Sequence, residues 1–255
     1  MVVRFLLVGF ALTLPAVAQN NFTILSHGKP AGKASYSFDK TKNGYKIKGK
    51  VNYHLSASAG TLDPVDPDPK TPRSLKASSI PGDRQFIQEY NLDANGTYDG
   101  GFITDMASQL NTGFTPNKSR DKLDVILSSA GQQQLKDPIA IKPNFVFLPN
   151  YDPSALQSVL LRATQHPTEK DLYLVVVPGG GRSDDEPVPA VWLTNQPEAH
   201  GTLDGKPLAL HHYVLRLYKS EYDIFADETN TLMMGTSSTL SAIYLRDGFV
   251  LTSVK

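Results

Sequence analysis

Three side chains in the C-terminal third could bind a metal ion if a β-hairpin brings them together. Asp204-Gly205 is a two-residue hairpin signal, so the strands on either side are predicted to pair with a tight turn between them. In that register Glu198 faces His211, and His200 lies diagonally from His211, about 7–8 Å away on the same face. Two histidines and a carboxylate can hold zinc and leave a position for water. A polar patch on a solvated face would give the same pattern, because no His-Glu-x-x-His motif supports the metal.

Other residues that could do chemistry lack the context their chemistry needs. Pro178-Gly179-Gly180-Gly181 is followed by no Gly-Lys-Ser/Thr, and Asp184-Asp185-Glu186 would repel a phosphate, so a flexible loop is predicted instead of a phosphate site. The acidic run lacks the spacing of a calcium loop and indicates a solvated turn. No Gly-x-Ser-x-Gly motif occurs, which removes the best-marked signal of a serine hydrolase. No catalytic residue and no cofactor are predicted.

Composition narrows the classes of function further. The chain has 255 residues, with 25 Lys and Arg against 25 Asp and Glu and no cysteine. Zero formal net charge argues against a nucleic-acid partner, because phosphate backbones need clustered excess cations. The absence of cysteine excludes disulfides, thiolate nucleophiles and iron–sulfur clusters.

The first eighteen residues have the three parts of an export signal. Arg4 precedes an apolar run from Phe5 to Leu14, Pro15 breaks the run, and Ala16-Val17-Ala18 gives the small-x-small pattern of a cleavage site. The run is shorter than the ~20 residues of a membrane span, and no later segment is long and apolar enough to be one. We therefore expect cleavage after Ala18 and a periplasmic or secreted protein of residues 19–255.

Period-two alternation dominates the rest of the chain and predicts a mainly β fold. Residues 33–55 alternate apolar and lysine-rich positions around an Asn43-Gly44 turn, which predicts an antiparallel hairpin with one buried and one solvated face. Residues 57–83 are rich in X-Pro bonds and predict a long loop that is mobile or functional. Further strands are predicted at 84–93, 97–108, 121–129, 139–148, 171–177, 188–195, 200–203, 206–218, 221–226, 231–236, 240–246 and 249–254.

One helix is predicted, beginning at Asp152-Pro153 and ending at His166-Pro167. Aspartate caps free amide groups, proline suits the first turn, and the residue before a proline disfavours the helical region. Leu156, Val159, Leu160 and Ala163 form a single apolar stripe, so one face of the helix is expected to be buried. The prediction is one β-rich domain over 19–255: an antiparallel curved sheet, or open half-barrel, of about ten strands with the helix packed on its concave face.

The C-terminal half resembles a group of uncharacterised exported bacterial proteins of the acidobacterial type. The residues that carry the resemblance are Asn144-Phe145, the capped helix 152–166, the strand ending Val175-Val176-Val177-Pro178, the run from Tyr222 to Leu232, and Leu245-Arg246-Asp247. The layout is also similar to periplasmic half-barrels related to the lipoprotein-carrier fold. The resemblance implies a sheet that wraps a helix, and it implies no reaction.

These observations favour a non-enzymatic role in the cell envelope. One-sided strands, a single helix and eight tyrosines on predicted strands are compatible with an apolar ligand site, although strand aromatics usually pack in the core. We expect binding or carriage of a hydrophobic or amphipathic small molecule, lipid-like in character. Two alternatives stay open: a metal-dependent hydrolase that uses Glu198, His200 and His211, and an envelope interaction or scaffold protein.

Overall fold

A computed structural model describes residues 19–55, 82–147, 152–169, 171–175, 188–194, 196–217, 220–237 and 242–255. The export signal, the glycine run, the acidic run and residues 57–81 of the proline-rich loop lie outside the described residues. The last two residues predicted for that loop, Gly82 and Asp83, begin a strand instead.

The described residues form eighteen strands and one helix, more strands than the ten or so predicted. The N-terminal strands are β1 (Gln19–Ser26), β2 (Lys29–Thr41), β3 (Gly44–Leu55), β4 (Gly82–Asp93), β5 (Tyr98–Asp105), β6 (Leu110–Pro116), β7 (Lys122–Ser129), β8 (Gln132–Leu135) and β9 (Ile139–Ala140). After β10 (Phe145–Phe147) and α1 (Pro153–Gln165) come β11 (Asp171–Val175), β12 (Val188–Leu193), β13 (Ala199–Leu203), β14 (Lys206–Leu217), β15 (Ser220–Ala226), β16 (Leu232–Ser237), β17 (Ala242–Arg246) and β18 (Phe249–Val254).

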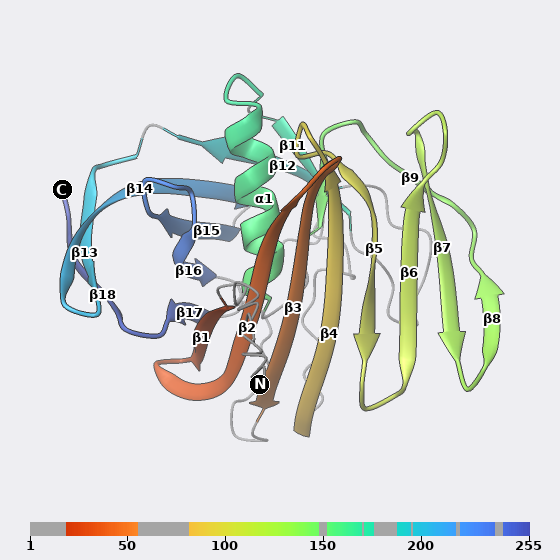
Figure 1. Cartoon of the computed structure of the whole chain (residues 1–255), viewed down its shortest axis with the longest axis horizontal. Coiled ribbons are helices and arrows are strands. Elements are labelled where there is room, and N and C mark those ends of the chain that lie inside the picture. The colour runs from red at the N-terminus through yellow and green to blue at the C-terminus, as the bar shows by residue number, and fades with distance from the viewer. Residues whose placement is uncertain are drawn as a thin grey trace, which may run out of the picture.

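The strands form one large, mostly antiparallel sheet that curves around α1 and does not close into a barrel (Figure 1). Strands β2 to β7 pair in chain order, and β1 lies between β2 and β17, where it joins the N-terminal strands to the C-terminal ones. The pair β10–β11 is parallel, an exception to the predicted antiparallel order. The fold class predicted from the sequence is therefore confirmed.

The lysine-rich hairpin is β2–β3, and its alternation follows the prediction. Ile47, Gly49 and Val51 of β3 are buried, whereas Lys48 and Lys50 between them are exposed. Because successive side chains of a strand point to opposite faces, the buried residues face α1 and the lysines lie on the outer face. The same rule holds in β7, where Leu123, Val125 and Leu127 are buried.

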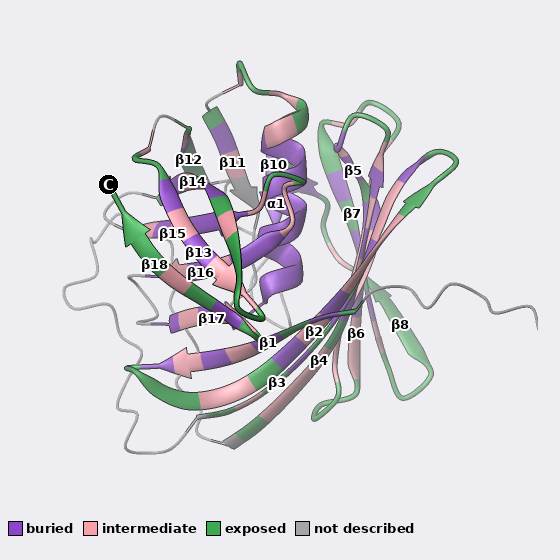
Figure 2. Cartoon of the chain, turned by 60° about the vertical axis from the view of Figure 1, so that its left-hand side comes forward, coloured by how far each residue is buried: buried purple, intermediate pink, exposed green. Residues whose placement is uncertain are grey.

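The helix begins and ends close to where the sequence predicts, but its burial differs from the prediction. Asp152 is the N-cap and accepts a hydrogen bond from the backbone N–H of Ser154 at 2.8 Å, and His166 is the C-cap. Every residue from Pro153 to Ala163 is buried, so the expectation of one buried face is wrong (Figure 2). Strands from both parts of the sheet contact the helix, β2 and β3 as well as β10 and β16, which a stripe of apolar residues does not reveal. Across the described residues, no helix is long and apolar enough to cross a membrane.

Candidate ligand-binding groove

Among the described residues, apolar side chains pack together on the concave side of the sheet, and this bears on where a ligand could bind. Strand β10 places Phe145 and Phe147 beside Tyr98, with ring centroids 5.6 and 4.8 Å from that of Tyr98. Phe114 packs on Phe147 at 4.4 Å. Together with α1, these rings occupy the hollow that a half-barrel carrier would use for an apolar ligand.

Three buried tyrosines hold the polar residues of α1. Tyr36 Oη donates to Gln157 Oε1 at 2.7 Å, Tyr90 Oη donates to Asp152 Oδ2 at 2.7 Å, and Tyr98 Oη hydrogen bonds with Ser158 Oγ. These bonds are needed because a buried polar group without a partner is destabilising. The prediction that strand tyrosines belong mostly to the core is confirmed for Tyr36, Tyr90, Tyr98 and Tyr222, all buried.

Burial also shifts the pKa values of these groups. Desolvation raises the pKa of Tyr90 well above its usual value, and the neighbouring Asp152 carboxylate raises it further. Desolvation raises the pKa of Asp152 as well, against hydrogen bonds from Ser154 and Tyr90 that lower it. The network is therefore a buried, hydrogen-bonded support for the start of the helix.

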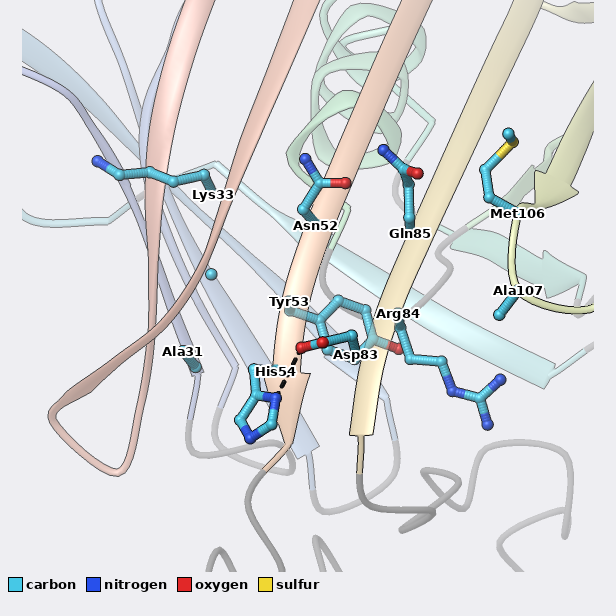
Figure 3. Close-up of a pocket in the computed structure, with 11 residues that line it drawn as sticks. Ala31, Lys33, Asn52, Tyr53, His54, Asp83, Arg84, Gln85, Met106 and Ala107 are labelled. Atoms are coloured by element: carbon cyan, nitrogen blue, oxygen red, sulfur yellow. Dashed lines mark hydrogen bonds and ion pairs between the residues drawn. The ribbon is translucent and has the colours of Figure 1, made fainter.

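The larger of the described grooves lies at the ends of β2, β3 and β4, next to the turn that follows β5 (Figure 3). Its volume is about 690 Å³. The sheet register explains its lining, since Lys33, Asn52 and Gln85 are directly opposite one another on neighbouring strands and share the outer face. Met106 closes one side, where its backbone N–H donates to the Gln85 carbonyl at 2.9 Å. The groove also has Ala31, Gly32, Tyr53, His54, Asp83, Arg84 and Ala107 in its lining.

Two ion pairs and an aromatic pair lie in or beside the groove. His54 Nδ1 lies 2.7 Å from Asp83 Oδ1 in an exposed pair at its mouth, which is drawn as a dashed line in Figure 3. Arg84 Nη1 lies 3.4 Å from Asp105 Oδ2, and both of these side chains are mostly buried. Tyr53 stacks on Phe86 with centroids 6.0 Å apart, and burial raises the pKa of Tyr53 to about 12 although Arg84 lowers it.

The hairpin predicted for the metal cluster is present in the expected register, with Leu203 opposite Lys206. Glu198 lies near His200, with Oε1 3.6 Å from Nε2, but its other oxygen binds Lys255 Nζ at 2.7 Å. Among the described residues, no three His, Asp or Glu side chains are placed to hold a metal ion. His211 instead lies with its ring 6.0 Å from Tyr213. Elemental analysis of protein purified without chelators is the direct test of the zinc prediction.

Sequence reasoning did not find the groove at the ends of β2–β4. His54 lies in the hairpin predicted over residues 33–55, and it pairs with Asp83, which was assigned to the loop. The signal that was available is the alternation in β3, which puts Asn52 and His54 on the solvated face. Nothing in the sequence showed that β4 would pair with β3 across a long connection.

Comparison with known proteins supports the fold and extends no further. No family model matches the sequence, and no curated protein matches it at a significant level. A crystal structure described as a β-barrel-like protein of domain of unknown function DUF1849, from Brucella abortus, is similar to this chain with a TM-score of 0.51 and 8% sequence identity. The similarity covers 92% of this chain and 97% of that chain. This chain is thus similar in fold to a barrel-like protein of unknown function.

Proposed function

We propose that this chain is an exported bacterial protein that binds a hydrophobic or amphipathic small molecule in the groove at the ends of β2–β4. The observation that carries the proposal is the location of open space. Core side chains and α1 fill the concave side, whereas the outer groove of about 690 Å³ combines Met106, Ala107 and Ala31 with charged and amide groups. Binding sites typically have volumes of about 300–1,000 Å³ and combine apolar walls with a few polar groups.

The polar residues of the groove suit orientation of a ligand and not a reaction. Asp83 and Arg84 are each paired with a neighbour, which leaves the amides of Asn52 and Gln85 between them as hydrogen-bonding groups. Met106 is 42% exposed and can shift among rotamers to fit irregular apolar shapes. The similarity to lipoprotein-carrier half-barrels that the C-terminal half suggests is in keeping with a lipid-like ligand and an envelope location, and both belong to this proposal.

The test is titration of residues 19–255 with the neutral apolar fluorophore N-phenyl-1-naphthylamine. We expect saturable binding at micromolar concentrations, and Met106→Gln is expected to weaken it about 5- to 10-fold, the loss from one buried apolar contact. Leu135→Gln is the matched control, because Leu135 is an exposed leucine at the far end of the sheet, 69% exposed. Absence of saturation, or equal weakening by both variants, would refute the groove and favour the interaction or scaffold class.

A further inference from the structure

We infer that the ligand carries an acidic group, and that Lys48 and Lys50 of β3 bind this group on the outer face of the sheet. The inference rests on the proposed function, because it assigns the apolar and acidic parts of one ligand to adjoining parts of one surface. It goes beyond that function in naming the ligand class as an amphipathic anion.

The groove at the ends of β2–β4 continues into two others on the same face. A groove of about 380 Å³ has Lys33 and Asn52 in its lining, and these two residues also line the larger groove. A third, of about 320 Å³, shares Gln19, Ser35 and Lys50 with the second. Figure 3 shows Lys33 and Asn52 side by side, with Lys33 extending away from the His54 end. The three grooves form a trough along β2 and β3 with Met106 at one end and Lys48 at the other.

The lining of the trough at its Lys48 end offers hydrogen-bond donors and contains no acidic residue. The third groove is lined by Gln19, Ser35, Ser37, Lys48, Gly49 and Lys50. The register puts Ser37 opposite Lys48 and Ser35 opposite Lys50, so each lysine has a serine directly across on the neighbouring strand. Ammonium, hydroxyl and amide groups together are donors suited to a carboxylate or phosphate oxygen.

Two carboxylates near the trough are already engaged by other residues. Glu89 lies opposite Lys48, but its Oε1 is 2.9 Å from Lys46 Nζ and also accepts from Asn91. Asp247 lines the middle groove, where its Oδ1 accepts from Thr23 Oγ1 at 2.8 Å and lies 3.4 Å from Lys33 Nζ. Lys48 and Lys50 thus keep positive charge that these acids do not neutralise.

Spacing within the strand sets the size of the acidic group. Residues two apart on a strand are about 7 Å apart on one face, so Lys48 and Lys50 can reach a single carboxylate or phosphate from two sides. From midway between Lys48 and Lys50, the Met106 end is about 10 Å along the strands and about 10 Å across them, roughly 14 Å in all. An extended acyl chain of about ten carbons covers most of that distance. A ligand with one acidic end and one apolar end matches the trough in both charge and length.

The experiment compares decanoate with decanol at pH 7.5, each displacing N-phenyl-1-naphthylamine from residues 19–255. Decanoate is expected to bind about 10-fold more tightly than decanol, and rising salt is expected to reduce the difference, because exposed charges are screened. The double variant Lys48→Gln/Lys50→Gln is expected to abolish most of the preference while its affinity for decanol stays unchanged. Decyl phosphate, run alongside, distinguishes a fatty acid from a phosphorylated lipid as the source of the acidic group.

The control is Lys122→Gln/Lys206→Gln, which removes the same charge from two exposed lysines outside the trough. It is expected to keep the preference for decanoate. Equal affinities of wild-type protein for decanoate and decanol, or a preference that survives in Lys48→Gln/Lys50→Gln, would overturn the inference while leaving the proposed function standing. If the fluorophore itself fails to bind, the proposed function fails. In that case, inorganic pyrophosphate is titrated into the protein and the amide NMR resonances of Ser35, Lys48 and Lys50 are followed, which tests the cationic end of the trough alone. If these resonances do not shift, the inference is overturned too.

Discussion

Gly49→Ala should destabilise the protein, because the first turn of α1 lies directly on this glycine. A Cβ at Gly49 would come within 2.8 Å of Ser154 Cβ and 3.1 Å of Gln88 Cγ. Real Cβ atoms essentially never come within 3.0 Å of another such atom, so the contact with Ser154 requires a shift. Since every residue from Pro153 to Ala163 is buried, α1 cannot move aside without disturbing the packing elsewhere.

The magnitude follows from two opposing effects. Overpacking a well-packed core destabilises by about 1–3 kcal/mol, and the upper half of that range applies to an enclosed helix. Replacing glycine by alanine also restricts the unfolded chain, which stabilises by about 0.4–1 kcal/mol. We therefore expect a net loss of about 2 kcal/mol in the free energy of unfolding. Ser154→Gly removes the closest contact, so the double variant should lose at least about 1 kcal/mol less than the sum of the single variants.

Urea unfolding followed by tryptophan fluorescence measures both quantities, because Trp192 is the sole tryptophan and is 2% exposed. Gly113→Ala in β6 is the matched control, since a Cβ there has no neighbour closer than the Ile126 carbonyl oxygen at 3.9 Å. It should be neutral or slightly stabilising. A Gly49→Ala variant as stable as the Gly113→Ala variant, or additive losses in the double variant, would refute the contact between α1 and β3.

Three further predictions concern the buried polar network. Tyr90→Phe should lower the free energy of unfolding by about 1–3 kcal/mol in urea, because Asp152 loses a buried donor, and a change below 0.5 kcal/mol would contradict the bond. Burial raises the pKa of Asp152 in the folded protein, so protonation of this carboxyl stabilises the folded state. The stabilisation is fully present below the unfolded pKa, near 3.9, and is lost as pH rises through the folded pKa. The deficit of Asp152→Asn relative to wild type should therefore be larger at pH 4 than at pH 7, and a deficit that grows with pH would refute the sign. Above pH 10, unfolding releases a proton from each buried tyrosine. This lowers the free energy of unfolding by about 1.4 kcal/mol per pH unit for each tyrosine. Tyrosine absorbance at 295 nm and Trp192 fluorescence should then change together in a cooperative alkaline transition; ionisation of Tyr36, Tyr90, Tyr98 and Tyr222 in a folded protein would rule this out.

Local signals in the sequence predicted local structure well. The Asp204-Gly205 turn set the pairing of its hairpin to the residue, and Asp152 and His166 marked both ends of α1. Strand β1 was not predicted, because Gln19–Ser26 has only two buried large apolar residues, Phe22 and Ile24, in a polar segment beside the expected export signal.

Features that depend on distant contacts were not predictable in the same way. The full burial of α1 depends on how far the sheet curves, and no single strand encodes that curvature. The groove depends on Asn52 lying opposite Gln85, which belongs to the next strand after a long connection. The pairing around the candidate metal residues was predictable, but the contact of Glu198 with Lys255, which is 57 residues away in sequence, was not.

Strand β1 connects the first and last parts of the chain within the sheet, because it pairs with β2 on one edge and with β17 on the other. Phe22 pairs with Ala34 on one side and with Arg246 on the other, so two contacts of the same residue are 12 and 224 residues distant in sequence. The sheet can become continuous only when the last strands have been made and brought back to the first. Contacts of such long range slow folding, because the chain must close a large loop before they form. A chain that is still being synthesised therefore lacks a partner for one edge of β1, and the sheet is completed only after its last strands have been made.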